Sequence, residues 1–108
     1  MPQYMLLLHD NHEGRAGLSP EQMQQTLQKY MDWTKHSVLH RRLGNDPGKV
    51  IRSKGGQTHT TDGPYSETKE VMGGIYLIEA KDYDEAVERT LDHPHLAHGT
   101  IELRQLYT

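Results

Sequence analysis

Two segments of the chain, residues 3–9 and 71–79, carry apolar side chains at successive positions rather than at every second position. A strand with this pattern is apolar on both faces and is buried on both sides in a folded domain. The rest of the sequence predicts only two helices, and two helices cover one face of a sheet. We therefore predict that a second copy of the chain covers the other face, in a homodimer packed sheet against sheet.

The first predicted helix runs from about residue 20 to residue 37. Ser19 is expected to be its N-cap, Pro20 its first residue, and Gln22 the partner of Ser19 in a capping box. Steps of three and four residues predict an inward face made of Met23, Leu27, Tyr30 or Met31, Thr34 and Val38.

The second predicted helix begins after Asp82, which forms a second capping box with Glu85, and it stops at Pro94. Its predicted inward face consists of Tyr83, Ala86 or Val87, and Thr90 or Leu91.

Short strands at 49–53 and 57–61 are expected to flank a hairpin turn at Lys54-Gly55-Gly56. Gly73 and Gly74 interrupt the second apolar strand, where missing side chains predict a bulge or the close approach of another group. A last strand is expected at 100–106. This order of elements predicts an α+β fold of the ferredoxin-like split βαβ type with an inserted hairpin, in a single domain over residues 1–108.

The composition supports association and excludes several classes of partner. Leu, Ile and Val make up 20 of 108 residues and Phe is absent, so the core of one chain is lean. A net charge of −3 without a basic run argues against nucleic acid and anionic membranes as partners. The chain has no cysteine, and its N-terminal apolar run is too short for a signal peptide or a membrane span, so we expect a cytoplasmic protein.

The densest polar segment runs from Asp62 to Glu70 and is followed by Gly73 and Gly74. It resembles the hallmark of the DGPF-domain proteins within the YCII-related superfamily, with Tyr65 as the aromatic residue. The resemblance extends over nearly the whole chain. The motif positions are Asp62, Gly63, Pro64, Tyr65, Glu67, Thr68, Lys69, Glu70, Gly73 and Gly74.

This resemblance implies a dimeric α+β barrel and says less about activity. Most such proteins have no established reaction, some are encoded beside sigma factors, and a few relatives are enzymes acting on small molecules. In those relatives a His of the first helix and an Asp are the proposed catalytic pair, and Tyr30 occupies the place of that His here. The segment from Ser37 to Gly44 is shorter than the family pattern and lacks its expected strand.

Two residues are our candidates for acid–base catalysis, Asp62 and His95. Asp62 either caps the turn at Gly63-Pro64 or serves as a general base at the mouth of a pocket. The resemblance favours His95 as a residue that faces the pocket, and the alternative is a position on the surface or at a helix C-terminus. Asp62 would form an acid–base dyad with His95 or with His9 if the side chains meet.

His9, Tyr30 and Tyr65 are the candidates for substrate binding, with packing roles as the alternative for His9 and Tyr65. Glu67, Lys69 and Glu70 are expected to form a solvated or dimer-bridging charge cluster. The spacing of His93, His95 and His98 is compatible with a metal, but no carboxylate-rich surroundings accompany it, so we predict neither metal nor cofactor.

The sequence therefore predicts a dimer that binds a small molecule in a cleft between sheet and helices, with cofactor-free acid–base catalysis as the candidate activity. The alternative is a non-enzymatic regulatory or protein-interaction module of the type associated with sigma factors.

Overall fold

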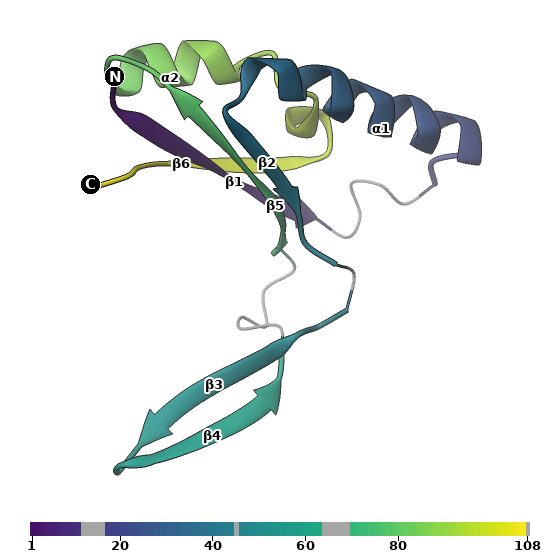
Figure 1. Cartoon of the computed structure of the whole chain (residues 1–108). Coiled ribbons are helices and arrows are strands. Elements are labelled where there is room, and N and C mark those ends of the chain that lie inside the picture. Colours follow the sequence, from purple (N-terminus) through teal and green to yellow (C-terminus); the bar gives the residue numbers. More distant parts are fainter. Residues whose placement is uncertain (12–16, 45, 64–69, 108) are drawn as a thin grey trace.

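The computed structural model describes residues 1–11, 17–44, 46–63 and 70–107. Four antiparallel strands form a sheet in the order β2-β5-β1-β6, and both α-helices lie on one face of it (Figure 1). This is an α+β arrangement consistent with a ferredoxin-like fold. The sheet contains β1 (Gln3–Asn11), β2 (Leu39–Arg42), β5 (Glu70–Glu79) and β6 (Gly99–Gln105), and the helices are α1 (Pro20–Trp33) and α2 (Tyr83–Thr90).

The two apolar segments form the centre of this sheet, as predicted. Strand β1 lies between β5 and β6, with Leu6 opposite Tyr76 on one side and Leu103 on the other. The predicted bulge is present on β5, because Leu8 pairs with Gly74 whereas His9 pairs with Met72, which leaves Gly73 as the additional residue.

The core lies between the helices and the sheet. Alternate residues of the strands face the helices and are buried together with side chains of both helices. The buried core consists of Tyr4, Leu6, Leu8, Tyr30, Trp33, Tyr76, Ile78, Ala80 and Ala86, with Ile101 and Leu103 packed against it.

The intervening strand residues point away from the helices and remain partly exposed. The apolar residues among them form a surface here called the open face, made of Met5, Leu7, Leu39, Ile75 and Leu77. Glu102 and Arg104 of β6 lie on the same side of the sheet, opposite Leu7 and Met5. Neither α-helix covers this surface (Figure 1).

The capping box of α1 is confirmed, since the Ser19 hydroxyl accepts a hydrogen bond from the Gln22 backbone N–H and the Gln22 side chain accepts one from the Ser19 N–H. The second box is half formed. Asp82 caps α2 by accepting from the Glu85 N–H, but the Glu85 carboxylate accepts from the Lys81 N–H instead of that of Asp82.

The predicted inward faces were partly wrong. In α1 the buried residues are Thr26, Tyr30 and Trp33. Met31 is exposed because it is rotated by about 100° around the helix from Tyr30, and a 3-10 turn replaces the α-helix at Thr34–His36. Val38, expected on this face, is also exposed.

In α2 only Ala86 and Thr90 are buried. The alternatives Val87 and Leu91 face solvent, and the helix ends at Thr90 instead of continuing to Pro94. Tyr83 is 45% exposed, yet its ring packs edge-on against Tyr4 at a centroid distance of 4.9 Å, and its hydroxyl accepts from the Gln105 N–H.

The inserted hairpin consists of β3 (Lys49–Lys54) and β4 (Gln57–Asp62), which form a separate two-stranded sheet. Gly55 and Gly56 both have positive φ, as a type I′ turn requires, so the predicted turn is confirmed. The hairpin projects from the body on the side opposite the helices (Figure 1). Among the described residues, no helix is long and apolar enough to cross a membrane.

Candidate functional site

His95 occupies the centre of the polar site. It lies in η2, a 3-10 turn of Pro94–Ala97 that joins α2 to β6, and it is fully buried. Pro94 takes the first position of this turn, and the ring of His93 caps it, with Nδ1 accepting from the His95 backbone N–H at 3.0 Å. The turn therefore holds the His95 side chain under the first helix.

Both ring nitrogens of His95 have partners. Nε2 lies 2.9 Å from the backbone carbonyl oxygen of His9, and Nδ1 lies 2.8 Å from the hydroxyl of Tyr30 in α1. A carbonyl oxygen only accepts hydrogen bonds, so Nε2 must carry a hydrogen. In the neutral ring Nδ1 is then the acceptor, and it accepts a hydrogen bond from the Tyr30 hydroxyl.

Asp10, near the end of β1, supplies a carboxylate to this nitrogen. Its Oδ1 atom is 3.7 Å from Nδ1 of His95, and its side chain is 31% exposed against 1% for His95. Asp10, His95 and Tyr30 thus bring a carboxylate, an imidazole and a phenol together, and the carboxylate lies nearest to solvent.

Two glycines make room for this cluster. A Cβ at Gly73, the bulged residue of β5, would lie 2.2 Å from Oδ2 of Asp10. A Cβ at Gly99 would lie 2.4 Å from the His9 carbonyl oxygen and 2.7 Å from Nε2 of His95. The close approach predicted at Gly73-Gly74 is therefore confirmed, and the approaching group at Gly73 is the Asp10 carboxylate.

An aromatic cluster encloses the site on the side of α1. The ring of His93 lies 4.4 Å from that of Trp33 and 4.7 Å from that of Tyr76, as centroid distances. Burial is the larger cause and the neighbouring His95 the next, and together they lower the pKa of His93 to about 4. Burial likewise raises the pKa of Tyr76 to about 12, and its hydroxyl donates to the Tyr30 carbonyl at 3.3 Å.

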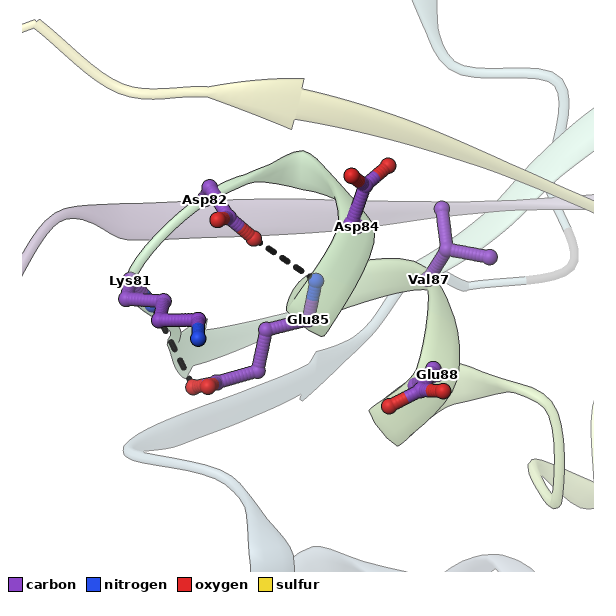
Figure 2. Close-up of a pocket in the computed structure, with 6 residues that line it drawn as sticks. All are labelled: Lys81, Asp82, Asp84, Glu85, Val87 and Glu88. Carbon is purple, nitrogen blue, oxygen red and sulfur yellow. Dashed lines mark hydrogen bonds between the residues drawn. The ribbon is translucent and has the colours of Figure 1, made fainter.

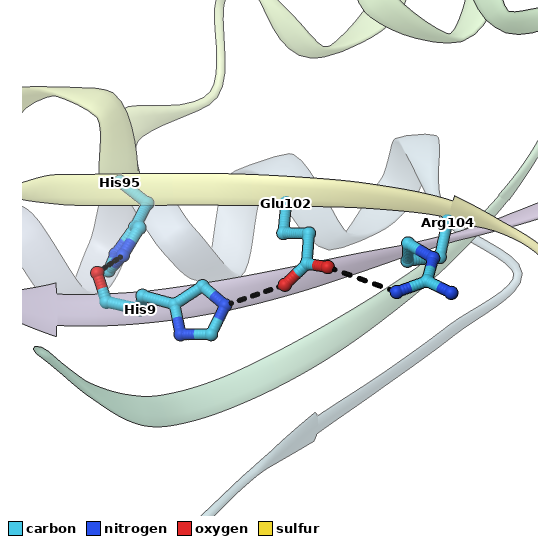
Figure 3. Close-up of polar contacts among 4 residues, drawn as sticks. All are labelled: His9, His95, Glu102 and Arg104. Carbon is cyan, nitrogen blue, oxygen red and sulfur yellow. Dashed lines mark hydrogen bonds and ion pairs between the residues drawn. The ribbon is translucent and has the colours of Figure 1, made fainter. Parts of the chain in front are cut away.

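The side chain of His9 does not join this cluster. It points to the open side of the sheet, where Nε2 lies 3.1 Å from Oε1 of Glu102, and Arg104 donates to the other oxygen at 3.3 Å (Figure 3). The hydrogen bond from His9, followed by that from Arg104, holds the pKa of Glu102 below its usual value. Only the backbone of His9 contacts His95.

Asp62 does not meet His95. It lies at the end of β4, exposed to solvent, and its carboxylate forms an ion pair with Lys49 across the hairpin. The predicted dyad is thus not formed by Asp62, and Asp10 occupies the position beside His95. Pro64, Tyr65, Glu67, Thr68 and Lys69 lie outside the described residues; Glu70, which follows them, pairs with Asn11 at the start of β5.

A separate hollow lies on the surface at the N-terminal end of α2 (Figure 2). Acidic side chains predominate in its lining, which consists of Lys81, Asp82, Asp84, Glu85, Val87 and Glu88. Within the described ranges, no cluster of three or more histidine or acidic side chains is arranged to hold a metal ion.

Comparison with known proteins identifies the family. The model of the YCII-related domain matches residues 3–108. A protein of Rhizobium meliloti (strain 1021) that is described as uncharacterized is 28% identical to this chain, over 95% of the chain and 90% of its own length. Because the domain match spans nearly every residue, the chain belongs to the YCII-related family.

Proposed function

We propose that this protein is a homodimer that binds a small polar molecule beside Asp10 and transfers protons to or from it without a cofactor. The observation that carries the proposal is the contact of His95 Nδ1 with both the Tyr30 hydroxyl and the Asp10 carboxylate. Buried proton-exchanging groups of this kind, with one member reaching solvent, are typical of acid–base sites.

Each of the three groups has a role in this proposal. Asp10 accepts or donates the substrate proton, because it is the most exposed of the three. His95 exchanges a proton through Nδ1, and the Asp10 carboxylate stabilises the imidazolium when it forms. Tyr30 orients Nδ1 and provides a second hydrogen-bonding group, while the His9 carbonyl fixes the ring through Nε2.

The homodimer is supported by the open face. Its apolar side chains belong to the two central strands and the edge strand β2. Both α-helices lie on one face of this sheet and leave the other face uncovered (Figure 1). Contiguous apolar surfaces of this kind mark association sites, and a second sheet packed against it would bury both copies of the patch.

Ligand screening by saturation-transfer NMR tests the acid–base proposal. The probe is a collection of small carboxylic acids, phenols and hydroxy acids, applied to the wild type and to Asp10→Asn, His95→Gln and Tyr30→Phe. Compounds that bind the wild type are expected to lose affinity for Asp10→Asn and to retain it for the control His36→Gln, an exposed position.

Two results would contradict this proposal. One is a set of bound compounds with equal affinity for the wild type and all three site variants. The other comes from amide NMR spectra of the protein recorded with the same compounds: chemical-shift changes confined to surfaces remote from β1 and η2 would favour a protein-interaction module.

Sedimentation equilibrium at micromolar concentration tests the association separately. We expect the mass of a dimer for the wild type and of a monomer for Leu7→Glu, which places a charge on the open face. A wild-type chain that sediments as a monomer rules out the homodimer.

A further inference from the structure

The β3–β4 hairpin, residues 49–62, is here called the arm. All of its residues are exposed except Val50, which is half-buried at the base near Gly63. Among the residues that the structure describes, its two strands pair with each other and with no other strand. An isolated two-stranded hairpin is at best marginally stable in water, so an arm of this kind needs a surface to pack on.

The direction of the arm indicates where this surface lies. The arm extends from the ends of β2 and β5 to the side of the sheet that the helices leave uncovered (Figure 1). This is also the side of the open face. A second copy seated on the open face would therefore lie next to the arm.

The two faces of the arm differ in chemistry. One carries Ile51, 70% exposed, with Thr60 opposite it and the ion pair of Lys49 with Asp62 at its base. This face is electrically balanced and rich in β-branched side chains. The other carries Arg52, Lys54 and His59 and is basic.

The charges of arm and body are complementary. Three basic residues and one acidic residue give the arm a charge of +2, whereas the whole chain has −3 with neutral histidines, so the rest of the chain carries −5. These opposite net charges favour the approach of the arm of one copy to the body of another over a distance, and they do not require the basic side chains to lie in the contact itself.

From these observations we propose that the arm packs on a second copy of this chain, with its Ile51 face inward and its basic face outward. The arm then enlarges the sheet-to-sheet contact and holds the partner in place. This inference rests on the homodimer proposed above and adds a defined element and a defined face to it.

Sedimentation velocity of paired variants tests the arm. Ile51→Lys introduces a charge on the inward face, and His59→Lys introduces the same charge on the opposite face of the same hairpin. We expect Ile51→Lys to raise the dimer dissociation constant about tenfold or more, and His59→Lys to leave it within about twofold. Equal effects of the two variants, or a larger effect of His59→Lys, would overturn the proposal.

A shortened arm provides an independent measurement. Val50 and Thr61 are cross-strand partners, so replacing residues 51–60 by Asn-Gly closes the hairpin with a two-residue turn. The body should keep its far-UV circular dichroism, and the dimer should weaken as for Ile51→Lys. If the shortened chain dimerises as tightly as the wild type, the proposed packing of the arm is refuted and the homodimer is not. If the wild type is a monomer, both proposals are refuted.

Discussion

The hydroxyl of Tyr30 and Nδ1 of His95 lie 2.8 Å apart although 65 residues separate them in the chain. This contact joins α1 to η2 and places a phenol on the one ring nitrogen of His95 that does not face a backbone carbonyl. The hydrogen bonding of the His95 ring therefore depends on how α1 packs on the sheet.

Removing this hydroxyl should destabilise the fold. Tyr30→Phe leaves a buried imidazole nitrogen with one hydrogen bond fewer, which should lower the free energy of unfolding by about 1–2 kcal/mol. Urea denaturation measures the difference. The control Tyr107→Phe, at a position 98% exposed, should change the free energy little. Equal stabilities of Tyr30→Phe and the wild type would show that this contact contributes nothing to the fold.

Alanine at the two site glycines should have unequal effects. At Gly99 a new Cβ meets the His9 carbonyl and the buried ring of His95, neither of which has room to move. At Gly73 it meets the end of a half-exposed carboxylate, which can rotate away. Gly99→Ala should cost about 1–3 kcal/mol of stability and Gly73→Ala less, as thermal denaturation would measure. The reverse order contradicts the described packing.

The stability of the protein should fall as the pH is lowered from about 6.5 to about 4. Burial lowers the pKa of His93 to about 4 in the folded state, against 6.5 for an unperturbed histidine. In this interval the unfolded chain binds the additional proton and the folded chain does not, so the free energy of unfolding rises with pH. The contribution of His93 should be about 1–2 kcal/mol between the two ends.

His93→Asn isolates this contribution in denaturation curves recorded at several pH values. An Asn side chain retains an acceptor for the His95 N–H but does not titrate. The pH dependence of stability should be smaller in this variant and unchanged in His59→Asn, an exposed histidine. An unaltered pH dependence in His93→Asn would exclude His93 as its source.

Glu102 should titrate differently when its partners are removed. The hydrogen bond from His9 is the largest cause of its lowered pKa, and that from Arg104 is the second. His9→Asn should therefore raise the pKa of the carboxyl group toward its usual value, and Arg104→Gln should raise it less. Carbon-13 NMR of the side-chain carboxyl measures both changes. A larger rise of the Glu102 pKa in Arg104→Gln than in His9→Asn would contradict this order of the two causes.

The fold was largely predictable because its central elements have strong local signals. The doubly apolar segments, the Ser19 cap, the Gly55-Gly56 turn and the Gly73 bulge all depend on residues close together in the sequence. Strand β2 was not predicted, since it has four residues and two of them are exposed arginines. Such an edge strand is specified by pairing with β5 and not by its own pattern.

The site was predictable in part. His95 and Tyr30 were candidates, and they are in contact. Asp10 was missed because its position in the sequence is typical of the polar end of a strand. Its proximity to His95 depends on how β1, β6 and η2 pack together in the fold. The signal that could have found it was the Gly73-Gly74 pair, which requires a close neighbour on the adjacent strand.

Trp33 is the sole tryptophan of the chain, and it lies in the aromatic cluster, with its indole N–H bonded to Asp92 at 3.1 Å and its ring beside His93. A protonated imidazole quenches indole fluorescence when the rings are this close. The fluorescence of Trp33 should therefore decrease as His93 gains a proton. It should also change when the surroundings of Tyr30 rearrange. Protonation of His93 can therefore be followed in unlabelled protein.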